Sequence, residues 1–148
     1  MTAADPFLVD TNVLIYHQIA LSPFHAAARS QLRDLFVAGN PLWLSRQILR
    51  EYLAAMSRPG TLTPPLPMTT LIADVQTFAS RFLIAEDGST VTVHLLSLLA
   101  SISCSGKQVH DANIVATMLA RGIPRLLTHN VADFSRFAGV ITVVPLVP

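Results

Sequence analysis

The stretch that decides the fold is Phe7-Leu8-Val9-Asp10-Thr11-Asn12-Val13-Leu14-Ile15-Tyr16. Apolar residues run up to Asp10, a polar triplet follows, and a second apolar run begins at Val13. The pattern predicts a buried strand that ends at Asp10 and a helix that begins at Thr11 or Asn12. A carboxylate within so much hydrocarbon is costly unless another group compensates its charge. Asp10 could cap the helix, but Asn12 could take that role and leave Asp10 free.

Strand and helix patterns alternate along the rest of the chain, and the proline-rich stretch Arg58–Pro67 is expected to form a loop. Helices are expected at Phe24–Ala38, Arg46–Ser57, Met68–Phe82, residues 89 or 90 to 103 and Asp111–Arg121, and a short helix or turn at Asn130–Phe137. Further strands are expected at Pro41–Ser45, Leu83–Ala85, Arg125–Thr128 and Val140–Val144. Repeated strand–helix units imply a parallel sheet covered on both faces. The sequence therefore predicts one α/β domain over residues 1–148, a three-layer αβα sandwich with a mainly parallel sheet of four to five strands.

The composition indicates which general class of protein the chain belongs to. With 148 residues, 51% of them hydrophobic, the chain can bury a substantial core. Cys104 is the only cysteine, so no internal disulfide can form, and a reducing cytoplasm is the expected compartment. No signal peptide is visible, and the longest apolar run, Val91–Cys104, is shorter than the roughly 18 residues that suggest a membrane span. A soluble cytoplasmic protein that does not enter the membrane is expected.

Three further acids lie on segments that could meet Asp10. Glu51 lies on the Arg46–Ser57 helix, away from its apolar face and beside Ala54 and Ala55, whose small side chains would let another element or a substrate come close. Asp111 is expected to open its helix, where the helix dipole favours a negative charge. Asp133 follows the Arg125–Thr128 strand, and Asn130 offers another oxygen nearby. Each acid taken singly is better explained as a capping, turn or solvated residue.

Taken together, the four acids suggest a shared site. Carboxylates at the carboxyl ends of parallel strands could converge on one edge of the sheet, where ligands of open α/β folds bind. Without a counter-charge they would repel one another, and some would be forced to protonate. A divalent cation resolves this, and Mg²⁺ and Mn²⁺ prefer carboxylate and water oxygens. The histidines show no zinc spacing. The sequence therefore predicts a Mg²⁺ or Mn²⁺ site on Asp10, Glu51, Asp111 and Asp133.

The order of these features resembles the PIN domain family, in particular the VapC-type ribonuclease toxins of toxin–antitoxin pairs. The features are a strand followed by Asp10-Thr11-Asn12, the helical Glu51, Asp111-Ala112 at a helix start, and a late Thr128-x-Asn130-x-x-Asp133-Phe134. The resemblance covers roughly Phe7 to Val144.

The resemblance implies an αβα sandwich that cleaves single-stranded or structured RNA with Mg²⁺ or Mn²⁺, typically as a homodimer inhibited by a cognate antitoxin. It implies that Asp10, Glu51, Asp111 and Asp133 are the catalytic acids, supported by the polar residues Thr11, Asn12, Ser45 and Thr128. Some relatives place the fourth acid three residues earlier, at the position of Asn130, so the fourth ligand stays open between these two residues. The loop Arg58–Pro67 is longer than expected for compact members.

Basic residues that flank the acidic segments are candidates to bind RNA phosphates. These candidates are Arg46, Arg50, Arg58 and Lys107, although each taken singly is better explained as a solvated surface charge. A net charge of only +1 argues against broad, tight RNA binding by a monomer, and a homodimer could combine two basic patches. The Phe24–Ala38 and Arg46–Ser57 helices are candidates for the antitoxin-binding surface because of their apolar content.

Other classes of α/β protein fit the sequence less well. A haloacid dehalogenase-type phosphohydrolase would need Asp where Asn12 stands, and a receiver domain would need a lysine on a late strand, whereas Lys107 precedes a helix. Two alternatives are closer: a catalytically inactive PIN-like module that acts by binding a partner, and an RNA-processing nuclease outside any toxin–antitoxin system. Retention of all four acids counts against the inactive module.

Overall fold

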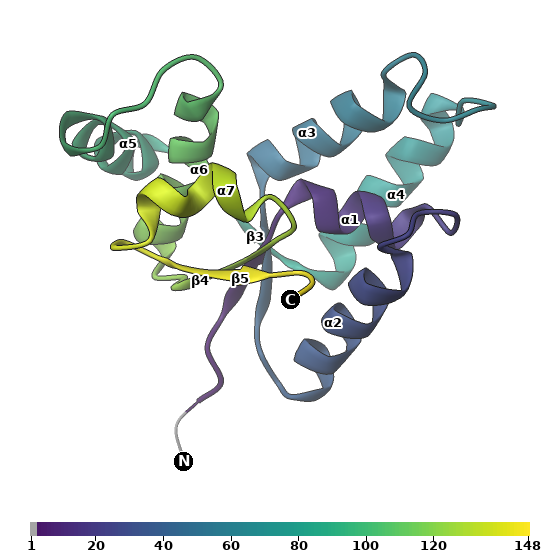
Figure 1. Cartoon of the computed structure of the whole chain (residues 1–148), viewed down its shortest axis with the longest axis horizontal. Helices are drawn as coiled ribbons and strands as arrows, with labels where there is room; N and C mark the ends of the chain where they lie inside the picture. Colours follow the sequence, from purple (N-terminus) through teal and green to yellow (C-terminus); the bar gives the residue numbers. More distant parts are fainter. Residues whose placement is uncertain (1–2) are drawn as a thin grey trace.

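The computed structural model describes residues 3–148 and has a five-stranded, all-parallel sheet with helices on both sides (Figure 1). The strands are β1 (Phe7–Val9), β2 (Leu42–Ser45), β3 (Leu83–Ala85), β4 (Arg125–Thr128) and β5 (Thr142–Pro145). The helices are α1 (Thr11–Gln18), α2 (His25–Val37), α3 (Arg46–Ser57), α4 (Met68–Arg81), α5 (Ser89–Ser101), α6 (Gln108–Arg121) and α7 (Val131–Phe134), followed by the 3₁₀ turn η1 (Ser135–Phe137). The predicted αβα sandwich is confirmed.

The strands are ordered β3-β2-β1-β4-β5, so β1 lies at the centre of the sheet. Leu8 pairs with Trp43 of β2 on one side and with Leu126 of β4 on the other. Because all strands run in the same direction, their carboxyl ends share one edge of the sheet. That edge receives the residues that follow β1 and β4, namely Asp10 and His129.

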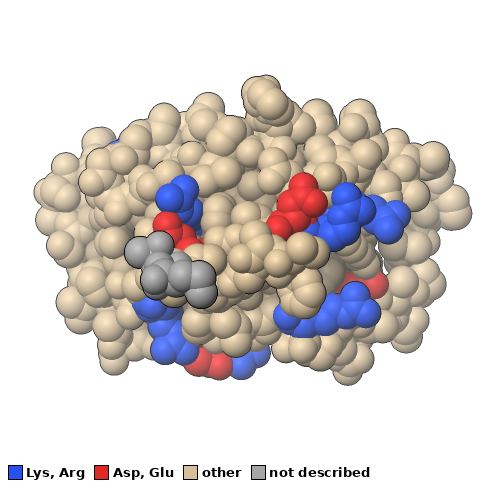
Figure 2. Space-filling model, turned by 90° about the horizontal axis from the view of Figure 1, so that it is seen from below, with Lys and Arg blue, Asp and Glu red and all other residues tan. Residues whose placement is uncertain are grey.

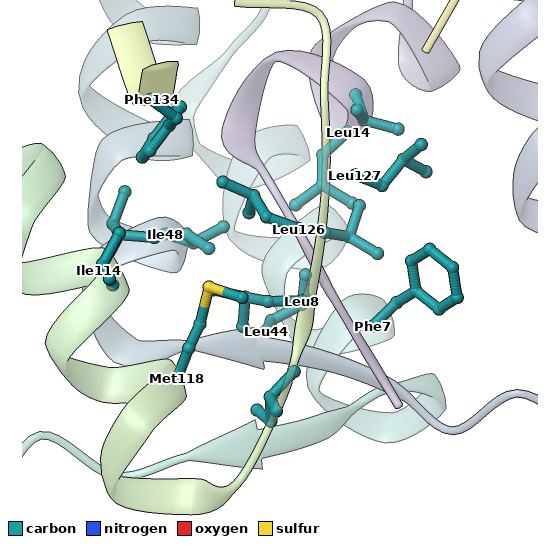
Figure 3. Close-up of a cluster of buried hydrophobic side chains, with 14 of the residues drawn as sticks. Phe7, Leu8, Leu14, Leu44, Ile48, Ile114, Met118, Leu126, Leu127 and Phe134 are labelled. Atoms are coloured by element: carbon teal, nitrogen blue, oxygen red, sulfur yellow. The ribbon is translucent and has the colours of Figure 1, made fainter. Parts of the chain in front are cut away.

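Helices α1 to α4 gather on the right of Figure 1, and α5 to α7 lie on its left, with the sheet between them. The core joins the strands to both groups. Leu8, Leu44 and Leu126 of the sheet are fully buried against Ile48 of α3 and Met118 of α6 (Figure 3). Strands buried on both faces read as continuous apolar runs, which explains the sequence before Asp10.

Element boundaries differ from expectation where local hydrogen bonds extend or shorten a helix. The structure begins α6 at Gln108, three residues before Asp111, because Gln108 and Ser105 bond reciprocally: the Gln108 side chain accepts from the Ser105 amide (3.0 Å), and the Gln108 amide donates to the Ser105 carbonyl (3.1 Å). At the other end Gly122 closes α6 with φ +68°, a left-handed conformation that glycine adopts without strain. The stretch Arg58–Pro67 has no helix or strand, as predicted.

The surface is sparsely charged. Figure 2 shows one face, on which Lys and Arg side chains and Asp and Glu side chains lie in a few separate groups within a largely uncharged surface. In the part of the chain that the structure describes, no helix has both the length and the apolar character needed to span a membrane.

Candidate active site

A cleft of about 320 Å³ lies at the carboxyl edge of the sheet, and all four predicted acids line it. They come from four separate elements: Asp10 follows β1, Glu51 lies on α3, Asp111 is in the first turn of α6, and Asp133 is on α7. The remaining lining residues are Thr11, Asn12, Ile15, Ala54, Ala55, Arg58, Ile114, Asn130 and Phe134. The fold therefore gathers acids that are as far apart as 123 positions in sequence, from 10 to 133.

Asp10 is buried, with 5% of its surface exposed, and is held by three donors. One carboxylate oxygen accepts from the Thr11 backbone amide (2.8 Å), and the other accepts from the Thr128 hydroxyl (2.8 Å) and the Asn12 side-chain amide (3.1 Å). Burial raises the pKa of Asp10 to about 6, and the charge of Glu51 adds to the rise, while these hydrogen bonds oppose it. Asp10, and not Asn12, is the N-cap of α1, so Asp10 both caps a helix and faces the cleft.

Glu51 is anchored at both of its carboxylate oxygens. Oε2 accepts from the Thr11 hydroxyl (3.0 Å), and Oε1 accepts from the Gln47 side-chain amide (2.8 Å). Thr11 therefore joins Glu51 to the segment that carries Asp10. One helical turn further on, Ala54 and Ala55 form part of the cleft wall, as their small size suggested.

Asp111 is half-buried at the start of α6. Burial is the largest cause that raises its pKa to about 6, and the charges of Asp133, Asp10 and Glu51 raise it further, whereas Arg136 lowers it. These charges act on Asp111 because the four carboxylates lie near one another. Two acids with a pKa this close to neutral pH are typical of a functional site.

Asn130 and Asp133 both line the cleft. The Asn130 backbone amide donates to the Thr128 hydroxyl (3.0 Å), and Asp133 is exposed and is the charged neighbour with the largest effect on Asp111. The geometry thus keeps both residues at the site, with the negative charge on Asp133.

The predicted supporting residues divide into two groups. Thr11, Asn12 and Thr128 bond directly to the acids, and Asn12 also accepts from the His129 backbone amide (2.9 Å). Ser45 does not line the cleft. Its buried hydroxyl accepts from the Ile48 amide (3.2 Å) as the N-cap of α3, so it stabilises the helix that carries Glu51.

The four basic residues predicted to bind RNA differ in their position relative to the cleft. Arg58 lines the cleft. Arg46 is engaged with Glu86 through two hydrogen bonds (2.6 and 3.0 Å), so its guanidinium is already paired. Arg50 and Lys107 are exposed and are not part of the cleft lining.

Three polar residues near the acids were not predicted as part of the site. Gln47 and Asn113 form a hydrogen-bonded chain with Glu51, and Arg136 acts on the charge of Asp111. Gln47 stands four positions before Glu51 in sequence, which is the one pattern that could have indicated it. Asn113 and Arg136 carry no comparable signal, because their proximity to the acids depends on the packing of α6 and η1.

The donor set of the cleft consists of oxygen atoms, which fits Mg²⁺ or Mn²⁺ and not a soft metal. Within residues 3–148, no three acidic, histidine or cysteine side chains are placed closely enough together to hold a metal ion as they stand. Burial is the main cause of the raised pKa of Asp10 and of Asp111, and the repulsion from neighbouring carboxylates that adds to both is the charge imbalance that a divalent cation would relieve.

A second, larger cavity of about 750 Å³ lies away from the acids and is lined by α1, α2 and α4. Its apolar lining includes Leu32, Phe36 and Phe78, and Phe36 is 73% exposed. Its charged lining is mainly basic, with Arg29, Arg33 and Arg81 against one acid, Asp74. Asp74 accepts from the Tyr52 hydroxyl (2.6 Å), and the three arginines outnumber this one acid.

The chain is similar to a known protein family and to several solved structures. The family model described as "PIN domain" matches residues 7–140. A curated relative, Ribonuclease VapC48 of Mycobacterium tuberculosis, is 28% identical over 134 residues, which cover 88% of this chain and 91% of the relative. The structure of VapBC2 from Rickettsia felis bound to a promoter DNA fragment is similar, with a TM-score of 0.71, 17% identity and coverage of 94% and 97% of the two chains. Mycobacterium tuberculosis VapC20, described as a Sarcin-Ricin loop cleaving toxin, matches with a TM-score of 0.66, 14% identity and coverage of 92% and 96%.

Proposed function

Because this chain belongs to the PIN domain family, we propose that it is a cytoplasmic endoribonuclease and the toxin of a toxin–antitoxin pair. The observation that carries the proposal is the convergence of Asp10, Glu51, Asp111 and Asp133 on one cleft. The ribonuclease relative and the structural likeness to toxin–antitoxin complexes support it. Single-stranded or structured RNA is the proposed substrate.

The four carboxylates would hold Mg²⁺ or Mn²⁺, and the bound cation would supply positive charge that acidifies water and offsets the charge of the phosphodiester. Asp111, half-buried in the cleft, would bind the cation beside Asp10, and an acid that contacts the cation only through water would take the proton of the attacking water. Asp10 is buried and accepts three hydrogen bonds, so it acts as a fixed ligand.

The reaction proposed is hydrolysis. Water loses a proton to a carboxylate of the cleft and attacks phosphorus in line, the bond from phosphorus to the 3′ oxygen breaks, and that oxygen takes up a proton from solvent. The products carry a 5′-phosphate and a 3′-hydroxyl. Arg58 is placed in the cleft wall, where its guanidinium can bind a neighbouring phosphate.

The test is cleavage of end-labelled RNAs of varied sequence by the purified protein with Mn²⁺, with EDTA, and with the Asp10→Asn and Asp111→Asn variants. The proposal expects cleavage that EDTA and either substitution abolish, with 5′-phosphate ends on the products. Cleavage that persists in both variants would point to a contaminant. Folded protein that cuts none of the RNAs would favour the inactive partner-binding module.

The cognate antitoxin is the proposed protein partner, and the 750 Å³ groove is its proposed binding surface. An amphipathic segment that carries acidic side chains would match the apolar floor and the three arginines. The groove includes α2, which was predicted for this role, but its other walls are α1 and α4, whereas the predicted α3 contributes none of its lining.

A homodimer is also proposed. Helix α5 supports it, because Val93 and Leu96 are 67% and 61% exposed on a helix without any charged residue. Light scattering on the purified protein measures the mass directly: twice the 16.0 kDa of one chain supports the dimer, and 16.0 kDa refutes it.

A further inference from the structure

Gln47 on α3 is a buried polar side chain whose amide is fully used. Only 6% of its surface is exposed. Its nitrogen donates one hydrogen to Glu51 Oε1 (2.8 Å) and the other to the backbone carbonyl oxygen of His110 (2.9 Å), and its oxygen accepts from Asn113 Nδ2 (2.8 Å). Both donors of the amide therefore have a partner, and so does its acceptor.

These partners determine the orientation of the amide. If the Gln47 nitrogen and oxygen exchanged places, the oxygen would face the Glu51 carboxylate and the His110 carbonyl, and the nitrogen would face the donor of Asn113. All three contacts would then join like groups. The side chain consequently has one arrangement in which every bond forms.

The partners belong to the segments that carry two of the four acids. Glu51 itself is one partner, and the His110 carbonyl is part of the peptide bond that leads into Asp111. Asn113 follows on the same helix and also donates to Asp87 Oδ2 (3.2 Å), which ties the group to the loop after β3. One amide thus connects α3 directly to the start of α6.

Packing alone does not account for glutamine at this position. A methionine would fill nearly the same volume, and burial of an amide costs free energy that its hydrogen bonds only offset. Polar residues retained in a core against this cost are expected at functional sites.

We propose that Gln47 is a positioning residue that fixes Glu51 relative to Asp111 so that the two carboxylates can bind one divalent cation together. The inference rests on the proposed function, because it concerns the cation of that site. It goes beyond the four acids by assigning their spacing to a neutral residue that lies outside the cleft lining.

The experiment compares the affinity of the metal-free full-length protein for Mn²⁺, measured by electron paramagnetic resonance of the free ion. The variant is Gln47→Met, and the matched control is Gln31→Met on α2, where the glutamine side chain donates to the Leu146 carbonyl (3.3 Å) and to none of the four acids. We expect Gln47→Met to weaken Mn²⁺ binding by about tenfold, the lower end of the effect of removing residues that orient metal ligands. Gln31→Met should leave the affinity within about twofold of the unsubstituted protein.

Circular dichroism and thermal unfolding of each variant separate positioning from stability. Should Gln47→Met fail to fold, Gln47→Asn decides, because its side chain is one methylene shorter and cannot reach Glu51 and His110 at once. A folded variant that binds Mn²⁺ as tightly as the unsubstituted protein overturns the inference, even if its melting temperature falls. If the unsubstituted protein itself binds no Mn²⁺, the metal site of the proposed function fails, and this inference fails with it.

Discussion

The hydroxyl of Thr128 donates to Asp10 at 2.8 Å and so joins the ends of β4 and β1, which are 118 positions apart in sequence. The same oxygen accepts from the Asn12 side chain and from the Asn130 backbone amide. Thr128 is fully buried, so its hydroxyl bonds to protein groups and not to bulk solvent. Its hydroxyl is the common point of the polar network around the buried acid.

Replacement of this hydroxyl by a methyl group tests the network. Thr128→Val should destabilise the metal-free protein by about 1–3 kcal/mol, because the buried Asp10 carboxylate loses a donor and the Asn12 and Asn130 nitrogens lose an acceptor. Urea unfolding measures the change. Thr117→Val is the control: Thr117 is equally buried, but its hydroxyl donates only to the Asn113 carbonyl of its own helix, so the cost should be smaller. Equal costs in the two variants would contradict a special role for Thr128.

Removal of one repelling charge should stabilise the metal-free protein. In Asp111→Asn the charge that burial and three other carboxylates disfavour is absent, and no hydrogen bond to the Asp111 side chain is lost among the described residues. We expect a gain of about 1 kcal/mol at pH 7.5, below the full value of the pKa shift because the side chain is only half-buried. Asp34→Asn, an exposed acid on α2, should leave the stability unchanged. A less stable Asp111→Asn would contradict the repulsion.

The raised pKa values give the metal-free protein a definite pH dependence. Asp10 and Asp111 titrate near 3.8 when unfolded and near 6 when folded, so the folded state binds their protons more tightly. Their contribution to stability is complete below pH 3.8 and is lost as the pH rises through about 6. The stability difference between Asp111→Asn and the unsubstituted protein should therefore grow from pH 4.5 to pH 7.5 in EDTA. A constant difference across this range would show that the pKa of Asp111 is not raised.

Arg58 and Arg46 should differ in their effect on RNA cleavage. Arg58 lines the cleft, whereas Arg46 is paired with Glu86. Arg58→Ala should raise KM for RNA by about tenfold, the loss of about one charge-assisted contact, and Arg46→Ala should change KM by less than about twofold. Steady-state cleavage of one labelled RNA gives both values. A larger change in KM for Arg46→Ala than for Arg58→Ala would indicate that the RNA contacts Arg46 instead.

The groove between α1, α2 and α4 should be required for capture of the antitoxin and dispensable for cleavage. Phe36→Ser removes an exposed aromatic ring from its lining and should weaken antitoxin binding by about tenfold or more, in the range of interface anchors. Leu21→Ser is the control, since Leu21 is 96% exposed and lies outside the groove lining. Calorimetry with the purified antitoxin provides the affinities. Unchanged binding by Phe36→Ser would place the antitoxin elsewhere.

The parts of the fold that depend on local sequence could be predicted. The apolar run before Asp10, the proline loop and the glycine at position 122 each determine the structure within a few residues, and the strand and helix pattern led to the correct sandwich. Convergence of the four acids on one edge followed from parallel strands. The order of the strands did not follow, because β1 lies between β2 and β4 through pairings that span the chain.

The hydrogen-bonded surroundings of the acids could not be predicted for the same reason. Glutamine is a residue type usually found at the surface, so the sequence gives no reason to place Gln47 in the interior. Only the packing of α6 against α3 places the His110 carbonyl beside it. Ser45 follows β2 much as Asp10 follows β1, yet its hydroxyl is consumed by the cap of α3. The start of α6 depended on a reciprocal bond between Ser105 and Gln108 that has no strong sequence signal.

The position of β4 has a consequence for the timing of synthesis. Thr128, Asn130 and Asp133 emerge from the ribosome only after residues 1–124, and until β4 inserts beside β1 the first acid lacks its hydroxyl donor. A nascent chain of which α1 to α6 have emerged therefore contains three of the four acids but not β4, whose Thr128 donates to Asp10. The cleft is therefore complete only after synthesis has passed Asp133.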